Sequence, residues 1–306
     1  MGRMATSLPA RAATRSIGDE DSGRWILWVG SAGRGELGLA RAAVAEQVQV
    51  VDAPHPQAAT SACGTGARSS PLFIVLASDR PGRWPPAEAV LLSRRWPLAP
   101  IVSVAASLSD GSRRSGPQLP GVEEVAWHHL GGRCGWWLAG LEERRPAGLG
   151  LPTTARREER LLESLSPLSH PAGSGRLPPT DVSIAAPRDE DLEPLADLLT
   201  AAGCRVAGRA VGRPSLDAAA RTVIWDVGRL AAGDFEWLRL MAANRPGVAV
   251  VLLESFPRGD AVEIALRAGA AAVLGRPVPL DVLAGTMLSL SRAVPRSHLG
   301  PERSDR

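Results

Sequence analysis

The sequence predicts an α/β fold of two flavodoxin-like domains, each a parallel five-strand sheet between two layers of helices. Three observations predict it. Short apolar runs alternate with amphipathic stretches along both halves of the chain. Several of these runs are continuously apolar, as in strands that are covered on both faces. A segment rich in proline and glycine, residues 146–180, separates the halves as an interdomain linker does. Such alternation gives doubly wound sheets, and the strand order 2-1-3-4-5 fits five strands.

The second domain, residues 181–292, is predicted most clearly. Leucines recur at helical spacing over residues 191–202, and Gly203 stands just past that helix. The predicted strands are residues 182–186, 205–207, 222–226, 248–253 and a last strand that ends at residues 275–277. The predicted helices are residues 191–202, 261–267 and 280–290. Together they indicate five strand-helix units.

The first domain, residues 24–145, repeats this plan with similar spacing, which indicates a duplication. Its predicted strands are residues 25–29, 48–51, 72–76, 101–104 and 122–127. Its predicted helices are residues 36–45, 87–95 and 130–143. We expect residues 1–23 to be a disordered tail and residues 293–306 to be a polar tail.

Composition excludes several classes of function. The 306 residues carry a net charge of only +3, with arginines and acids interspersed, so we expect no nucleic-acid partner. The sequence has no lysine, so no lysine can act as a catalytic base or phosphate ligand. No apolar run approaches the roughly 18 residues of a membrane span. Cys63, Cys134 and Cys204 form no C-x-x-C pair, which predicts reduced thiols and a cytoplasmic protein.

Polar residues stand where three strands of the second domain end. Asp226 closes the third strand, Glu254 and Ser255 follow the fourth, and Arg276-Pro277 follows the fifth. This order resembles a response-regulator receiver domain, which places an aspartate, a hydroxyl residue and lysine-proline there. The resemblance implies a role in two-component signalling, exerted through the face of the last strand and last two helices. It extends more weakly to the first domain, so the chain resembles two receiver domains in tandem.

The departures from the receiver pattern indicate that the chemistry is lost. The acidic pair that would hold Mg²⁺ after the first strand falls on Ala186 and Pro187. Without the metal, nothing offsets the charge of phosphoryl transfer to Asp226. Glu254 would repel a phosphoryl group, and Arg276, in place of lysine, is placed to form an ion pair with Asp226.

We therefore read Asp226, Glu254, Ser255 and Arg276 as a vestigial pocket with no metal and no cofactor. The acids of residues 189–191 lie near it, but they suit the first turn of a helix.

The first domain departs further from the receiver pattern. Its phosphoacceptor position falls on Ala77, followed by Ser78 and Asp79. Residues 127–129, Trp-His-His, stand where lysine-proline would be. His128, His129 and Cys134 match no standard zinc spacing, so we expect buried or solvated imidazoles there.

A competing motif lies in the first domain. Gly33, Gly35 and Gly38 match G-x-G-x-x-G between a strand and a helix, and Asp52 ends the next strand. In a dinucleotide-binding protein such a loop holds pyrophosphate and the acid binds a ribose hydroxyl. The turn that begins at Gly30 is too long for the usual tight join, so we expect no tight NAD or NADP binding.

Two surfaces are candidates for partner contacts. Trp136 and Trp137 are adjacent in a predicted helix and cannot both face one core, so at least one should lie at an edge. In the last helix, Val282 and Leu288 lie away from the main apolar stripe and should be partly exposed. They predict self-association or a protein partner through that helix.

These observations favour a non-catalytic signalling or scaffold protein that acts by protein-protein interaction. No output domain follows residue 292 in the sequence as given, which supports a binding role by elimination. We expect no enzyme activity, cofactor, nucleic acid or membrane. Two alternatives remain open: a dinucleotide-binding, oxidoreductase-like protein that uses the Gly30–Gly38 loop, and a response regulator phosphorylated at Asp226.

Overall fold

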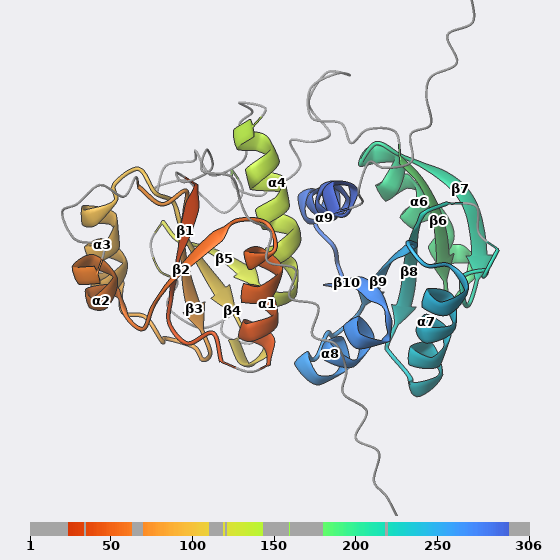
Figure 1. Ribbon diagram of the computed structural model, residues 1–306, viewed down its shortest axis with the longest axis horizontal. Coiled ribbons are helices and arrows are strands. Elements are labelled where there is room, and N and C mark those ends of the chain that lie inside the picture. Colours follow the sequence, from red (N-terminus) through yellow and green to blue (C-terminus); the bar gives the residue numbers. More distant parts are fainter. Residues whose placement is uncertain are drawn as a thin grey trace, which may run out of the picture.

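The computed structural model describes residues 24–33, 35–62, 70–109, 119, 121–142, 159, 180–217 and 220–293. The predicted tails apart from residue 293, Cys63, and the predicted linker apart from residues 159 and 180 lie outside these residues. Two α/β domains lie side by side, with the first (red to yellow-green) and the second (green to blue) meeting along their helices (Figure 1). Among the described residues, no helix combines the length and apolarity needed to cross a bilayer.

Domain one is a parallel sheet in the order β2-β1-β3-β4-β5. Its strands are β1 (Trp25–Val29), β2 (Gln49–Ala53), β3 (Ile74–Ser78), β4 (Ile101–Ala105) and β5 (Glu123–Ala126). Its helices are α1 (Glu36–Ala45), α2 (Pro56–Ala62), α3 (Pro86–Arg95) and α4 (Leu130–Glu142), with 3-10 turns η1 (Ser107–Ser109) and η3 (Trp127–His129). Helices α1 and α4 cover one face of the sheet, and α2 and α3 cover the other (Figure 1).

Domain two repeats the strand order as β10-β9-β8-β6-β7, again parallel throughout. Its strands are β6 (Thr180–Ala186), β7 (Cys204–Val211), β8 (Thr222–Gly228), β9 (Ala249–Glu254) and β10 (Ala270–Gly275). Its helices are α6 (Leu192–Ala201), α7 (Ala232–Asn244), α8 (Gly259–Ala268) and α9 (Leu280–Ala293), and η5 (Asp189–Asp191) is a 3-10 turn before α6. The predicted fold class, two flavodoxin-like domains with parallel five-strand sheets, is confirmed.

The largest differences from prediction concern strand β7 and helices α2 and α7. Strand β7 runs over eight residues, of which the sequence predicts only a start at residues 205–207. The rest was missed because exposed and half-buried positions alternate along this edge strand, which gives no continuous apolar run. Helices α2 and α7 were not predicted, since neither shows a clear apolar stripe. The expectation of five strand-helix units in domain two is wrong, because the described part of the connection from β7 to β8 contains no helix.

The domains share one hydrophobic core. Trp28 on β1, Leu130 on α4 and Trp225 on β8 belong to a single cluster of buried residues that continues from the α1/α4 face of domain one into domain two. Separate clusters fill the α2/α3 face of domain one and the α6/α9 face of domain two. The two halves therefore pack as one unit rather than as independent domains on a linker.

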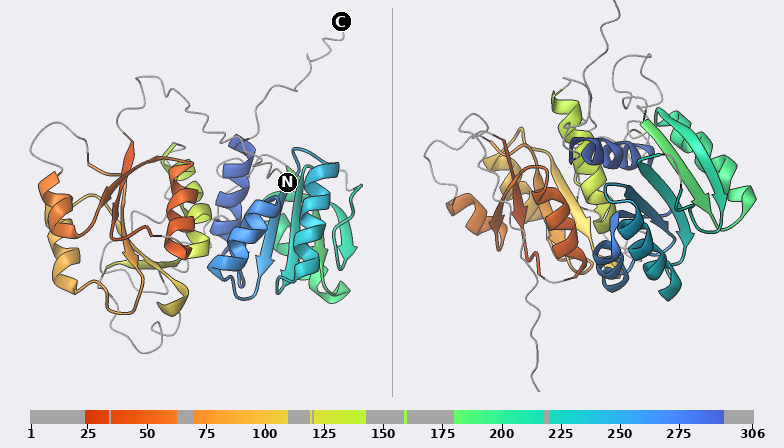
Figure 2. Two further views of the ribbon diagram at one scale, coloured as in Figure 1. Left: turned by 60° about the horizontal axis from the view of Figure 1, so that its bottom comes forward. Right: turned by 45° about the vertical axis from the view of Figure 1, so that its right-hand side comes forward.

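Helices α4 and α9 form the centre of this junction, side by side in every view (Figures 1 and 2). Glycines let their backbones touch: a Cβ at Gly285 would collide with the carbonyl oxygen of Gly132, and one at Gly135 would lie 2.6 Å from the Gly285 carbonyl oxygen. Because this contact encloses α4, the prediction that Trp136 or Trp137 lies at an edge is wrong; they are 3% and 0% exposed.

The exposure predicted for the last helix is also wrong at Val282. This residue is buried, because its backbone and side chain face Gly132 on α4. Leu288 is half-buried and packs against the core clusters on either side of α9. The face of α9 that the sequence predicts for a partner is covered by domain one of the same chain.

Candidate functional site

The pocket of domain two lies where β8 and β10 end. Asp226 is 4% exposed, and its Oδ1 accepts a hydrogen bond of 3.0 Å from the Gly228 backbone N–H. The Arg276 guanidinium contacts both carboxylate oxygens, with Nη1 3.0 Å from Oδ1 and 2.9 Å from Oδ2. The predicted ion pair between Asp226 and Arg276 is thus present in the structure.

Burial raises the pKa of Asp226, because an ionised carboxylate is poorly solvated there. Hydrogen bonding from Gly228 and the charge of Arg276 act in the opposite direction. The Arg276 side chain is itself partly exposed, so solvent screens its effect. Arg276 therefore offsets only part of the cost of holding this carboxylate inside the protein.

Residues that would hold a metal ion beside Asp226 do not fit one. Ala186 ends β6 and offers only its backbone carbonyl, which already accepts a hydrogen bond from Gly212. Asp191, the nearby acid, accepts two hydrogen bonds from Arg188, and this pairing lowers its pKa. Within the described ranges, three or more His, Cys, Asp or Glu side chains nowhere gather as metal ligands.

The other two residues of the predicted pocket face elsewhere. Glu254 is 6% exposed, and its Oε1 lies 3.5 Å from the backbone N–H of Leu230. Its neighbouring charges are Arg229 and Asp260 rather than Asp226. Ser255 is exposed and donates its backbone N–H to the Gly228 carbonyl. The side chains of Asp226 and Arg276 thus meet, whereas the Glu254 side chain turns to Leu230 and Ser255 contributes only a backbone N–H.

Glu254→Gln is expected to stabilise the protein at neutral pH. Burial raises the pKa of Glu254, and its Oε2 has no hydrogen-bond partner. The folded state therefore binds this proton more tightly than the unfolded state, so ionisation costs stability at any pH above the ordinary value of 4.5. The gain should be seen in urea denaturation at pH 7 and should vanish below pH 4.5; a loss at pH 7 would contradict it.

At the corresponding end of the domain-one sheet, the described residues include no buried ion pair comparable to that of Asp226 and Arg276. Ala77 is buried, and Ser78 shares a 3.1 Å hydrogen bond with Ser103. Asp79 lies 3.8 Å from Arg83 at the surface. His128 and His129 do not meet Cys134 as ligands but contact domain two, where each bonds the backbone of Gly275. Burial raises the pKa of the Cys134 thiol to about 12, which keeps it protonated.

The glycine-rich loop of domain one has structural reasons for its glycines. Gly30 and Gly35 have φ values of 108° and 89°, which favour glycine. A Cβ at Gly38 would collide with the Gly33 carbonyl oxygen. The loop borders an open hollow of about 770 Å³ that Arg41, Asp52 and Arg83 also line.

Three contacts oppose dinucleotide binding in that hollow. Asp52, which would bind the ribose, accepts hydrogen bonds of 2.7 and 2.5 Å from Arg41. At the start of α1, where pyrophosphate would lie, the Glu36 carboxylate accepts hydrogen bonds from the backbone and hydroxyl of Ser107. Gly259 at the start of α8 packs against the same turn. The Glu36 carboxylate and the start of α8 thus lie at the N-terminus of α1, where a dinucleotide would place its pyrophosphate.

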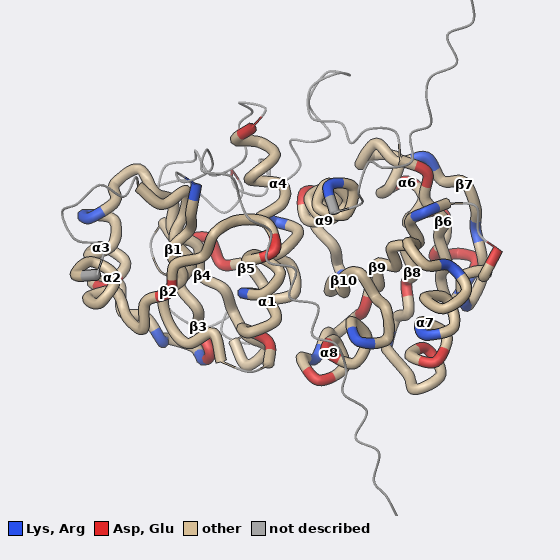
Figure 3. Tube along the Cα trace, in the orientation of Figure 1, with Lys and Arg blue, Asp and Glu red and all other residues tan. Residues whose placement is uncertain are grey.

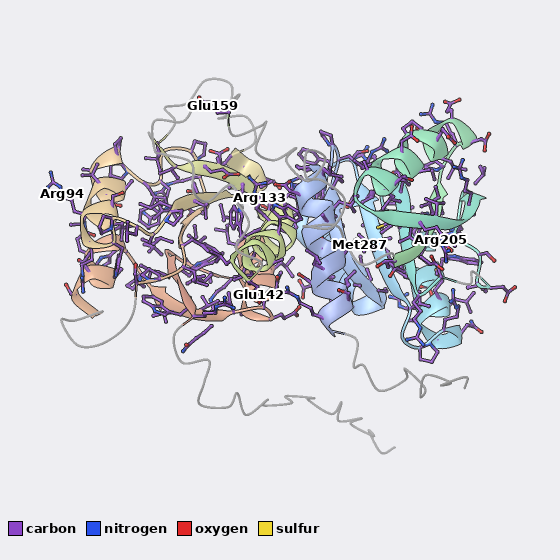
Figure 4. The ribbon with its side chains drawn as sticks, turned by 90° about the horizontal axis from the view of Figure 1, so that it is seen from above. Arg94, Arg133, Glu142, Glu159, Arg205 and Met287 are labelled. Atoms are coloured by element: carbon purple, nitrogen blue, oxygen red, sulfur yellow. The ribbon has the colours of Figure 1, made fainter. Side chains whose placement is uncertain are left out.

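Sequence reasoning missed the charged residues of the domain junction. Arg133 on α4 forms ion pairs with Asp281 on α9 and, at 2.6 Å, with Glu123 on β5. Figure 4 places Arg133 where α4 faces α9. One feature of the sequence could have revealed this ion pair: a single arginine stands among glycines and tryptophans in residues 131–137, on a helix that is otherwise apolar enough to be buried. Elsewhere, Figure 3 shows acids and bases interspersed over both domains, as the composition predicts.

No family model and no curated protein matches the sequence. Solved structures do. A structure described as a pilus assembly-related protein from Burkholderia pseudomallei is 23% identical; the match covers 38% of this chain and 93% of that one, with a TM-score of 0.35. A structure described as a pilus assembly protein from Burkholderia thailandensis is 24% identical over 37% of this chain and 98% of its own, with a TM-score of 0.35.

A response regulator from Thermotoga maritima is 15% identical over 38% of this chain and all of its own, with a TM-score of 0.33. Each match has about the length of one domain. The strand order that both sheets share is that of the flavodoxin-like fold. The chain thus consists of two flavodoxin-like domains.

Proposed function

We propose that this chain is a non-catalytic signalling protein that works by binding other proteins and is not phosphorylated at Asp226. One observation carries the proposal. The Arg276 guanidinium pairs with both oxygens of the Asp226 carboxylate, while Ala186 and Pro187 supply no carboxylate for a metal ion. A phosphoryl group would have to displace the guanidinium without a metal ion to offset its charge. The receiver-like fold supports a response-regulator-like role.

Incubation with acetyl phosphate and Mg²⁺ is expected to leave the protein unmodified. Intact-mass spectrometry of the wild type and of Asp226→Asn should give the same absence of a phosphoryl adduct. The triple variant Ala186→Asp/Pro187→Asp/Arg276→Lys, which supplies the missing receiver residues, serves as the gain-of-function comparison. A substantial adduct on the wild type that Asp226→Asn abolishes would instead make this a working response regulator.

The second candidate, dinucleotide binding, is favoured only by the size of the hollow beside Gly30–Gly38, which falls in the range of small-molecule sites. The Arg41–Asp52 pair and the carboxylate of Glu36 weigh against it. We therefore rank protein binding first. Partners are expected to be proteins rather than nucleic acid or membrane. While the domains are docked, a partner must use surfaces other than the side of α9 that domain one covers.

A further inference from the structure

Gly275, the last residue of β10, is bonded to domain one through both of its backbone polar groups. Its N–H donates to Nδ1 of His128 over 3.2 Å, and its carbonyl oxygen lies 2.8 Å from Nε2 of His129. A Cβ at this position would enter the His128 ring, so only glycine fits between β9 and η3. Two side chains of domain one thus fix one residue at the end of the domain-two sheet.

The next residue along the chain is Arg276, whose guanidinium holds Asp226. Its own backbone N–H donates to the Glu254 carbonyl over 2.8 Å. The backbone of Arg276 is therefore positioned by two contacts: a hydrogen bond to β9 in its own domain, and the histidines of domain one, which hold the preceding residue. Since hydrogen bonds weaken steeply with distance and angle, a small shift of this strand end would weaken the hydrogen bonds between Arg276 and Asp226.

We propose that His128 and His129 are positioning residues: by holding Gly275 they keep Arg276 on Asp226, and separation of the domains releases this pair. Coupling of this kind is reciprocal, so a ligand or partner that engages Asp226 weakens the docking of the domains by the same factor. A protein that competes with domain one for α9 would, in turn, free the Asp226 carboxylate.

Further contacts between α4 and α9 hold the two domains together in this structure, and so keep Gly275 against the two histidines. Ser289 on α9 donates to Gln47 over 2.9 Å, and Arg292 pairs with Glu142 at 2.6 Å. The glycine contact between α4 and α9 lies between these polar contacts and the Arg133–Asp281 pair. Any change that pushes α9 away from α4 therefore also pulls Gly275 from the histidines.

The test measures the pKa of Asp226 by ¹³C NMR of its carboxyl carbon in the full chain. Arg276→Met sets the value without the guanidinium, which is higher than in the wild type because a positive charge is lost. In His128→Ala/His129→Ala, the pKa of Asp226 is expected to shift towards the Arg276→Met value. Gly285→Leu is expected to separate the domains, seen as a larger radius of gyration in small-angle X-ray scattering, and to shift the pKa likewise.

Ser291→Leu puts the same new side chain on an exposed position of α9 and should change neither quantity. A wild-type pKa of Asp226 in the double histidine variant would overturn the proposal, whatever Gly285→Leu does. If Gly285→Leu does not fold or stays docked, the histidine variant decides alone. Amide spectra confirm the fold of each variant.

Discussion

Arg133→Met is expected to lower the free energy of unfolding by about 3–5 kcal/mol, the cost of removing one partner from a buried ion pair. The side chains of Arg133 and Asp281 are 8% and 0% exposed, so the carboxylate left behind could not be solvated by water. Glu123 would lose its partner as well. Urea denaturation, followed by tryptophan fluorescence and far-UV circular dichroism, measures the change.

Two further variants separate charge burial from other effects. Arg205→Met removes an arginine whose partner Asp181 is exposed, and it should leave stability nearly unchanged because water screens this pair. Arg133→Met/Asp281→Leu removes both buried charges and should recover most of the loss. If Arg133→Met proved as stable as Arg205→Met, the domain junction would not bury the charges of Arg133 and Asp281 in solution.

Trp137→Ala is expected to cost about 3–5 kcal/mol of unfolding free energy, as for other large aromatic side chains removed from a core. Trp137 is fully buried, with its ring 5.2 Å from that of Phe73 in an edge-to-face contact. The Arg133 guanidinium lies 5.3 Å from the same ring, so the substitution also removes a cation-π contact.

Leu98→Ala is the matched control in the same domain, because Leu98 is 90% exposed. It should change the unfolding free energy by no more than about 0.5 kcal/mol. Thermal and urea unfolding of both variants, compared with the wild type, check the prediction. Equal stability of Trp137→Ala and Leu98→Ala would show that α4 is not packed against the domain-one sheet as described.

The fold could be predicted from the sequence because its signals are local. Continuous apolar runs such as residues 248–253 mark central strands, and the leucines of residues 191–202 mark an amphipathic helix. Strand β7 was seen only in part because an edge strand buries few side chains and lacks such a run. Helix α7 carries apolar residues without a clear stripe, so periodicity did not reveal it.

The candidate site was predictable only where one residue pairs with another at a strand end. The ends of β8 and β10 meet at one edge of the sheet, so the contact of Asp226 with Arg276 followed from fold and order. The direction of Glu254 did not follow, because a register irregularity between Asp226 and Gly228 shifts its neighbours. Nor did the burial of Val282 and Trp136, since no local pattern reveals which surfaces of two domains meet.

The glycine contact between α4 and α9 also affects how the chain is made. Helix α4 leaves the ribosome roughly 150 residues before α9 is complete, an interval on the order of ten seconds at typical rates of synthesis. During that time the apolar side of α4 faces water or a chaperone rather than its partner. A nascent chain that stalls within domain two would therefore expose the apolar surface of α4 to neighbouring chains. Aggregation would then begin from domain one, even though the sheet of that domain had already formed.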